Sequence, residues 1–135
     1  MKIEEARILV RYRLDEAQGA LTDAKILIEG KGTVVSIINR SYYAMFYAAL
    51  ALLQTMGKAS SKHTGVLSLF DTEFVMKEIL PRELGRNFHR AFEQRQTADY
   101  RITELPTQAM AEEIYREAIA FVETSRMYLK QNGWV

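Results

Sequence analysis

Two short segments combine arginine with aromatic residues in patterns suited to binding an anion. The first, residues 39–47, reads Asn-Arg-Ser-Tyr-Tyr-Ala-Met-Phe-Tyr and places Arg40 and Tyr43 about one turn apart on an expected helix. A guanidinium binds phosphate through two parallel hydrogen bonds, and tyrosine rings stack on nucleobases. The pattern also has a structural interpretation, in which Arg40 reaches solvent at the end of a bundle or pairs with a carboxylate while the tyrosines pack in the core.

The second segment, residues 95–101, reads Arg-Gln-Thr-Ala-Asp-Tyr-Arg. We expect a helix to end near Thr97 and an irregular stretch to follow over residues 98–106, so that neighbouring side chains can converge. Arg95 and Tyr100 then supply a phosphate-binding group and a stacking ring. The structural alternative is an ion pair between Arg95 and Asp99, four residues apart, with Tyr100 covering the core.

Composition excludes several classes of protein. The chain has 135 residues, and its 18 lysines and arginines against 17 aspartates and glutamates give a net charge of +1. No overall field therefore attracts nucleic acid or an anionic membrane, and any RNA binding must come from a local patch. The stretch 82–101 is such a mild patch, since it holds five arginines against three acidic residues.

Metal, disulfide and membrane chemistry are not expected. The chain has no cysteine, and His63 and His89 are its two histidines, so we predict neither a zinc site nor a cofactor. The N-terminus lacks an apolar run of signal-peptide length, and charged residues interrupt the hydrophobic stretches before they could span a bilayer. We therefore expect a cytoplasmic protein.

Apolar residues recur at intervals of three and four, as the buried face of a helix requires. The expected helices span 3–29, 33–56, 60–79, 81–97 and 107–131. Thr33 is suited to cap the second helix and Ser60 or Ser61 the third, while Pro81 suits the first position of the fourth. The second helix carries two apolar stripes, which places it in the middle of a bundle.

No segment alternates polar and apolar residues as a half-buried strand does. The connections between the longest helices are short, which favours antiparallel packing of neighbours. We therefore predict an all-α fold, an antiparallel up-and-down bundle of about five helices that forms one domain over residues 1–135.

Three motifs, in this order, resemble the signature of small prokaryotic HEPN-domain proteins. They are Asn-Arg-Ser-Tyr-Tyr-Ala-Met-Phe at residues 39–46, Lys-His-Thr-Gly at 62–65 and Arg-Gln-Thr-Ala-Asp-Tyr at 95–100. The resemblance covers nearly the whole chain from the first helix onward. It implies a helical bundle that dimerises and is often encoded beside a minimal nucleotidyltransferase, as a toxin and antitoxin pair.

Many proteins of this family are metal-independent ribonucleases, so the resemblance also makes ribonuclease activity a candidate function. In those proteins an arginine stabilises phosphate charge, and a histidine four to six residues later takes part in proton transfer. Here Tyr47 lies seven positions after Arg40 and Tyr100 five positions after Arg95. A phenol with a pKa of about 10 is a poor general base at neutral pH, so the chain departs from the catalytic pattern.

One arginine does precede a histidine at a similar spacing, in the pair Arg82 and His89. The resemblance does not place the active motif there, and short patterns of this kind often arise by accident. We interpret the pair as part of a solvated basic face.

The sequence thus predicts a HEPN-like binding and interaction module, a homodimer that pairs with a separate nucleotidyltransferase and binds RNA or a nucleotide. The expected site residues are Arg40, Tyr43, Arg95, Asp99 and Tyr100. One alternative is a ribonuclease toxin that uses Arg95 or Arg40 with a substitute for the missing histidine. Another is a scaffold in which the signature residues only hold the bundle together.

Overall fold

The computed structural model describes residues 2–100 and 105–135, except for the side chains of residues 99 and 100. Its helices are α1 (Ile3–Glu29), α2 (Val34–Gln54), α3 (His63–Phe70), α4 (Arg82–Tyr100) and α5 (Gln108–Gln131), and a π-helical segment, Asp71–Val75, continues α3. Within the described ranges the chain forms no strand. The predicted all-α fold is confirmed.

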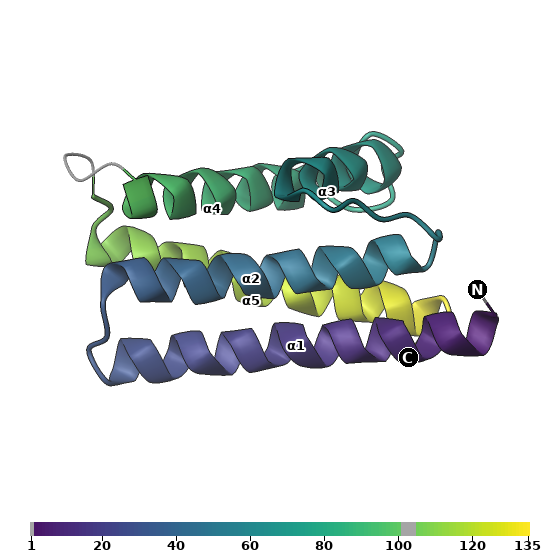
Figure 1. Cartoon of the computed structure of the whole chain (residues 1–135), viewed down its shortest axis with the longest axis horizontal. Helices are drawn as coiled ribbons and strands as arrows, with labels where there is room; N and C mark the ends of the chain where they lie inside the picture. Colours follow the sequence, from purple (N-terminus) through teal and green to yellow (C-terminus); the bar gives the residue numbers. More distant parts are fainter. Residues whose placement is uncertain (1, 101–104) are drawn as a thin grey trace.

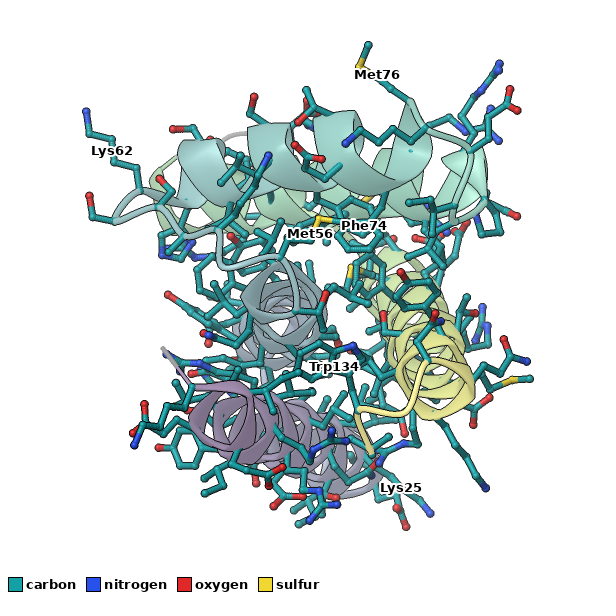
Figure 2. The ribbon with its side chains drawn as sticks, turned by 90° about the vertical axis from the view of Figure 1, so that its right-hand side faces the viewer. Lys25, Met56, Lys62, Phe74, Met76 and Trp134 are labelled. Carbon is teal, nitrogen blue, oxygen red and sulfur yellow. The ribbon has the colours of Figure 1, made fainter. Side chains whose placement is uncertain are left out.

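The four long helices lie along one axis and alternate in direction, with α1 and α4 opposed to α2 and α5 (Figure 1). The short helix α3 runs across this axis, over one side of the bundle (Figure 2). The bundle is therefore up-and-down, as predicted, with α3 inserted between the second and third long helices.

The turn between α1 and α2 follows from local chemistry. The hydroxyl of Thr33 accepts a hydrogen bond from the backbone N–H of Ser36 at 3.2 Å, so the predicted cap is confirmed. The N–H of Gly32 donates to the carbonyl of Leu27 at 2.6 Å, and a Cβ at Gly32 would lie 2.7 Å from Leu27 Cδ2. A Cβ here would require the Leu27 side chain to shift, so glycine eases the close passage of the turn past α1.

Helix α2 lies in the middle of the bundle, between α1, α4 and α5. Eleven of its residues are buried, and they occur on more than one side of the helix. This confirms the expectation from its two apolar stripes. The motif at residues 39–47 is consequently held in a rigid element, and the side of α2 that faces α4 presents part of it.

The start of α3 differs from the prediction. Neither Ser60 nor Ser61 is the cap, because the helix begins at His63 and Lys62 holds the N-cap position without a side-chain hydrogen bond. The hydroxyl of Ser60 instead accepts a hydrogen bond from the N–H of Lys62 at 3.2 Å, one step before the helix begins. Serine thus orders the loop rather than the helix end.

The ends of the two middle helices were also wrongly placed from the sequence. The expected helix to residue 79 ends at Phe70, and the π-helical segment and a turn follow. The π-helical segment still buries Phe74, so the apolar pattern continues although the helix geometry changes. Helix α4 reaches Tyr100 rather than residue 97, so Asp99 and Tyr100 lie on its last turn and not on an irregular stretch.

Aromatic rings join α3, α4 and α5 in the core. The ring centres of Phe70 and Phe121 lie 5.2 Å apart, and Phe88 lies 5.7 Å from Phe70 and 5.3 Å from Phe121. All three rings are fully buried, so this contact fixes α4 against the rest of the bundle. In the described part of the chain, no helix is both long and apolar enough to cross a membrane.

Candidate functional site

Five side chains meet where α2 and α4 face each other near the start of α3, and they form what we term the Arg–Tyr–His cluster. They are Arg40, Tyr42, Tyr43, His63 and Arg95. The guanidinium carbon of Arg95 lies 5.2 Å from the ring centre of Tyr42 and 5.4 Å from that of Tyr43. That of Arg40 lies 5.2 Å from the ring centre of Tyr43. Two cations from different helices therefore lie within cation–π range of one ring.

Helix α4 brings Arg95 to the tyrosines through an apolar stripe. Phe88, Phe92 and Arg95 follow one another at steps of four and three, so they share a face of the helix. The ring centre of Tyr42 lies 6.0 Å from that of Phe88 and 5.8 Å from that of Phe92. Burial of these rings thus determines where the guanidinium of Arg95 lies.

His63 enters the cluster from the first turn of α3. Its Nδ1 lies 2.6 Å from the hydroxyl oxygen of Tyr42, within hydrogen-bond distance. Its ring stacks on Phe46 with centres 4.4 Å apart and planes 18° apart. The edge of Tyr43 also meets the ring, with centres 5.8 Å apart. The imidazole is therefore held by one hydrogen bond and by aromatic neighbours that include Phe46 and Tyr43.

The loop before α3 explains why glycine follows this histidine. A Cβ at Gly65 would clash with the hydroxyl oxygen of Ser60 and lie 2.7 Å from its Cβ. Only a residue without a Cβ lets the loop pack against the first turn of α3. Gly65 thus supports the position of His63.

The protonation states of the cluster follow from burial and from Arg95. Burial raises the pKa of the fully buried Tyr42, and the charge of Arg95 and a hydrogen bond from it offset this only in part. Burial also lowers the pKa of His63, and the positive charge of Arg95 lowers it further. At neutral pH the phenol and the imidazole are therefore both uncharged.

Arg40 is bound to an amide in this arrangement. Its Nε and Nη2 donate to the side-chain oxygen of Asn39 at 3.1 and 2.9 Å, and the side chain is half-buried. An amide oxygen orients the guanidinium without neutralising its charge. The cation can therefore still attract an anion from solvent.

The structure brings three of the predicted site residues together, Arg40, Tyr43 and Arg95. The side chains of Asp99 and Tyr100 lie outside the described residues, so the ion pair of Arg95 with Asp99 stays a prediction. Their backbone positions are on the last turn of α4, about one turn beyond Arg95.

Sequence reasoning missed His63 and Tyr42 as members of the site. His63 stood in the Lys-His-Thr-Gly motif, and that motif was the signal that could have identified it. Its contact with Tyr42 joins residues 21 positions apart on two helices. Helical periodicity reports only neighbours within one helix, so it does not reveal this contact.

Three further residues considered from the sequence, His89, Arg82 and Tyr47, lie outside the cluster. His89 Nε2 lies 2.5 Å from a carboxylate oxygen of Asp71, in the π-helical segment. Arg82 is exposed. Tyr47 lies next to the cluster, and its pKa is raised first by burial and then by the negative charge of Glu16. Its phenol stays protonated at neutral pH, which supports the view that it is no general base.

The chain is thus an α-helical domain with a cationic, aromatic site. Arginine, tyrosine and histidine side chains meet there between antiparallel helices. The sequence model of the HEPN domain matches residues 4–128. This chain belongs to the HEPN-domain family, which confirms the resemblance seen in its three motifs.

Relatives with assigned names support the same membership. The chain is 41% identical over 98 residues to a UPF0332 protein of Thermotoga maritima, covering 73% of this chain and 74% of that protein. It is 34% identical over 128 residues to a Methanocaldococcus jannaschii protein named "Putative toxin MJ0605", covering 95% and 94%. A second protein of that organism, "Putative toxin MJ0142", is 37% identical over 92 residues, covering 68% and 63%.

The lowered pKa of His63 predicts how stability depends on pH. Below about pH 6.5 the unfolded chain binds more protons at this residue than the folded chain does. The free energy of unfolding is therefore highest above that pH and falls as the pH drops toward and through the folded-state pKa. We expect urea unfolding to show a smaller fall between about pH 7.5 and 5 in His63→Gln than in the wild type.

Other titrating groups are present in both proteins and cancel in this comparison. An equal fall in the two proteins would show that His63 has the same pKa folded and unfolded.

Proposed function

We propose that this protein is a toxin–antitoxin-type module that binds RNA by its phosphate backbone at the Arg–Tyr–His cluster. The observation that carries the proposal is that Arg40 of α2 and Arg95 of α4 both lie over the ring of Tyr43. Two guanidiniums on adjacent helices can bind a phosphate from two sides, and an aromatic ring beside them can stack on an unpaired base. HEPN membership and the toxin names of two relatives support the proposal.

The burial of the cluster favours a single-stranded segment. Arg40, Tyr43 and Arg95 are half-buried, so each retains surface that a ligand can touch. Because the net charge is only +1, binding depends on a few phosphates rather than on a long charged track. Asp99 and Tyr100 stay proposed members of the site. A free nucleotide carries the same phosphate and base, and it should compete with RNA here.

Replacing either arginine should weaken RNA binding. We expect Arg40→Gln and Arg95→Gln each to lower affinity for a labelled single-stranded RNA by about 10- to 100-fold, because each removes hydrogen bonds to a charged phosphate. The slope of log affinity against log salt concentration should become shallower by about one in each variant, as expected for the loss of one phosphate contact. Fluorescence anisotropy at several salt concentrations measures both quantities.

The matched control for these variants is Arg126→Gln, which removes an exposed arginine of α5. It should bind as the wild type does. Circular dichroism should confirm that all three variants are folded. Equal affinity in the two site variants and the control would contradict RNA binding at the cluster.

We also propose that the protein forms a homodimer and pairs with a separate nucleotidyltransferase chain. Both proposals rest on the resemblance of its motifs to the HEPN family. The dimer predicts a mass twice that of the chain in light scattering over a dilution series. A monomer mass at micromolar concentration that does not grow on concentrating would contradict it. Co-expression with a neighbouring nucleotidyltransferase, followed by purification through a tag on one chain, tests the pairing.

RNA cleavage is a second candidate, because an imidazole lies beside Arg95 in the cluster. Histidine is the usual proton-transfer group in metal-independent cleavage near neutral pH. A general base there must accept the proton of the ribose 2′-hydroxyl through an unprotonated nitrogen. Nδ1 of His63 lies 2.6 Å from the hydroxyl of Tyr42, and when Nδ1 accepts a hydrogen bond from that hydroxyl the ring proton lies on Nε2.

We therefore expect RNA binding with little or no cleavage. Nε2 of His63 has no free electron pair in this state, and Tyr47 keeps its proton because its pKa is raised. The measurement is incubation of purified protein with single-stranded and structured RNA in excess EDTA, beside Arg95→Gln. Cleavage by the wild type that disappears in this variant would establish the ribonuclease instead.

A further inference from the structure

We propose that His63 is a third anion-binding group of the site, and that its Nε2–H donates a hydrogen bond to a phosphate oxygen of the bound RNA. Tyr42 is a positioning residue that holds His63 in the required tautomer. This inference rests on the proposed function, because it assigns a further contact to the same ligand.

The first step concerns the direction of the hydrogen bonds at Tyr42. Its hydroxyl is fully buried and needs partners inside the protein. Arg95 can only donate, so in its hydrogen bond with Tyr42 the phenol oxygen accepts. The proton of the phenol is then directed to its other neighbour, His63 Nδ1, at 2.6 Å. The chain of hydrogen bonds therefore runs from Arg95 through Tyr42 to His63.

The second step assigns the imidazole tautomer. A neutral histidine carries one ring proton, and a nitrogen that accepts a hydrogen bond cannot hold it. With Nδ1 accepting from Tyr42, the proton lies on Nε2. A ring flip would place a carbon against the buried phenol oxygen and lose this bond, while the stacking on Phe46 at 4.4 Å holds the ring plane.

The third step places this donor at the ligand site. The two ring nitrogens point in different directions, so with Nδ1 facing the buried phenol, Nε2 faces away from it. His63 is half-buried, and its ring centre lies 5.8 Å from that of Tyr43, the ring shared by Arg40 and Arg95. The guanidiniums of Arg40 and Arg95 and the imidazole of His63 therefore all lie close to the same ring.

A neutral donor suits this position for an electrostatic reason. A protonated imidazole would add a further positive charge beside Arg95, and burial and then the charge of Arg95 already lower the pKa of His63. A neutral ring contributes a hydrogen bond without this repulsion. Phosphate oxygens are strong acceptors, so they match the donors of Arg40, Arg95 and His63.

The structural alternative is that His63 serves only as the buried acceptor for Tyr42. Two substitutions separate the alternatives. In His63→Gln, the amide oxygen can accept from Tyr42 and the amide N–H₂ can donate to a ligand, as the two ring nitrogens do now. In His63→Phe, the ring can still stack on Phe46, but both the acceptor and the donor are absent.

We expect His63→Gln to bind single-stranded RNA with an affinity within about threefold of the wild type, and His63→Phe to bind about tenfold more weakly. Fluorescence anisotropy gives the affinities, and thermal unfolding shows whether each variant is folded at the assay temperature. Wild-type affinity in a folded His63→Phe would overturn the inference. An equal loss in both variants would also overturn it, because the donor would then make no difference.

Nuclear magnetic resonance of the wild type tests the tautomer directly, even if His63→Phe does not fold. Long-range ¹H–¹⁵N spectra should show His63 protonated at Nε2, and the Nε2 signal should shift when the RNA is added. Protonation at Nδ1, or no shift, would overturn the inference. If binding depends on Arg40 and Arg95 but not on His63, only this inference fails. If the wild type binds no RNA, the proposed function fails and the inference fails with it.

Discussion

The buried hydroxyl of Tyr42 is the constraint on which the site depends. A phenol that no water reaches must find its hydrogen-bond partners within the protein, and one left unpaired costs about 1–3 kcal/mol. Tyr42 of α2 finds them in Arg95 of α4 and His63 of α3. One buried polar group thus ties together three helices.

The same contacts prepare the site for an anion. The guanidiniums of Arg95 and Arg40 lie over aromatic rings, and Asn39 holds Arg40 in one orientation. Side chains already held in place lose less conformational freedom when a ligand binds, so more of each contact's free energy appears as affinity. The same residues therefore contribute to both stability and binding. Replacing these arginines with Gln, which keeps polar contacts, is more informative than replacing them with Ala.

Much of the fold could be read from the sequence, and the failures have a common cause. The bounds of α1, α2 and α5 and the Thr33 cap follow from apolar periodicity and helix-capping chemistry, which are local. The end of α3 at Phe70 could not be read in this way. A π-helical segment adds one residue per turn yet still buries Phe74, so the apolar pattern shows no break.

For the site, the sequence by itself determined the all-α class, the family and the arginine and tyrosine residues of two motifs. Arg40 and Tyr43 are about one turn apart on one helix, so their proximity is a property of local geometry. Only the tertiary structure decided that Arg95 shares the ring of Tyr43 and that His63 completes the cluster. These contacts depend on how α2, α3 and α4 pack. That packing is set by the burial of their aromatic rings, and it cannot be read from the spacing of residues along the chain.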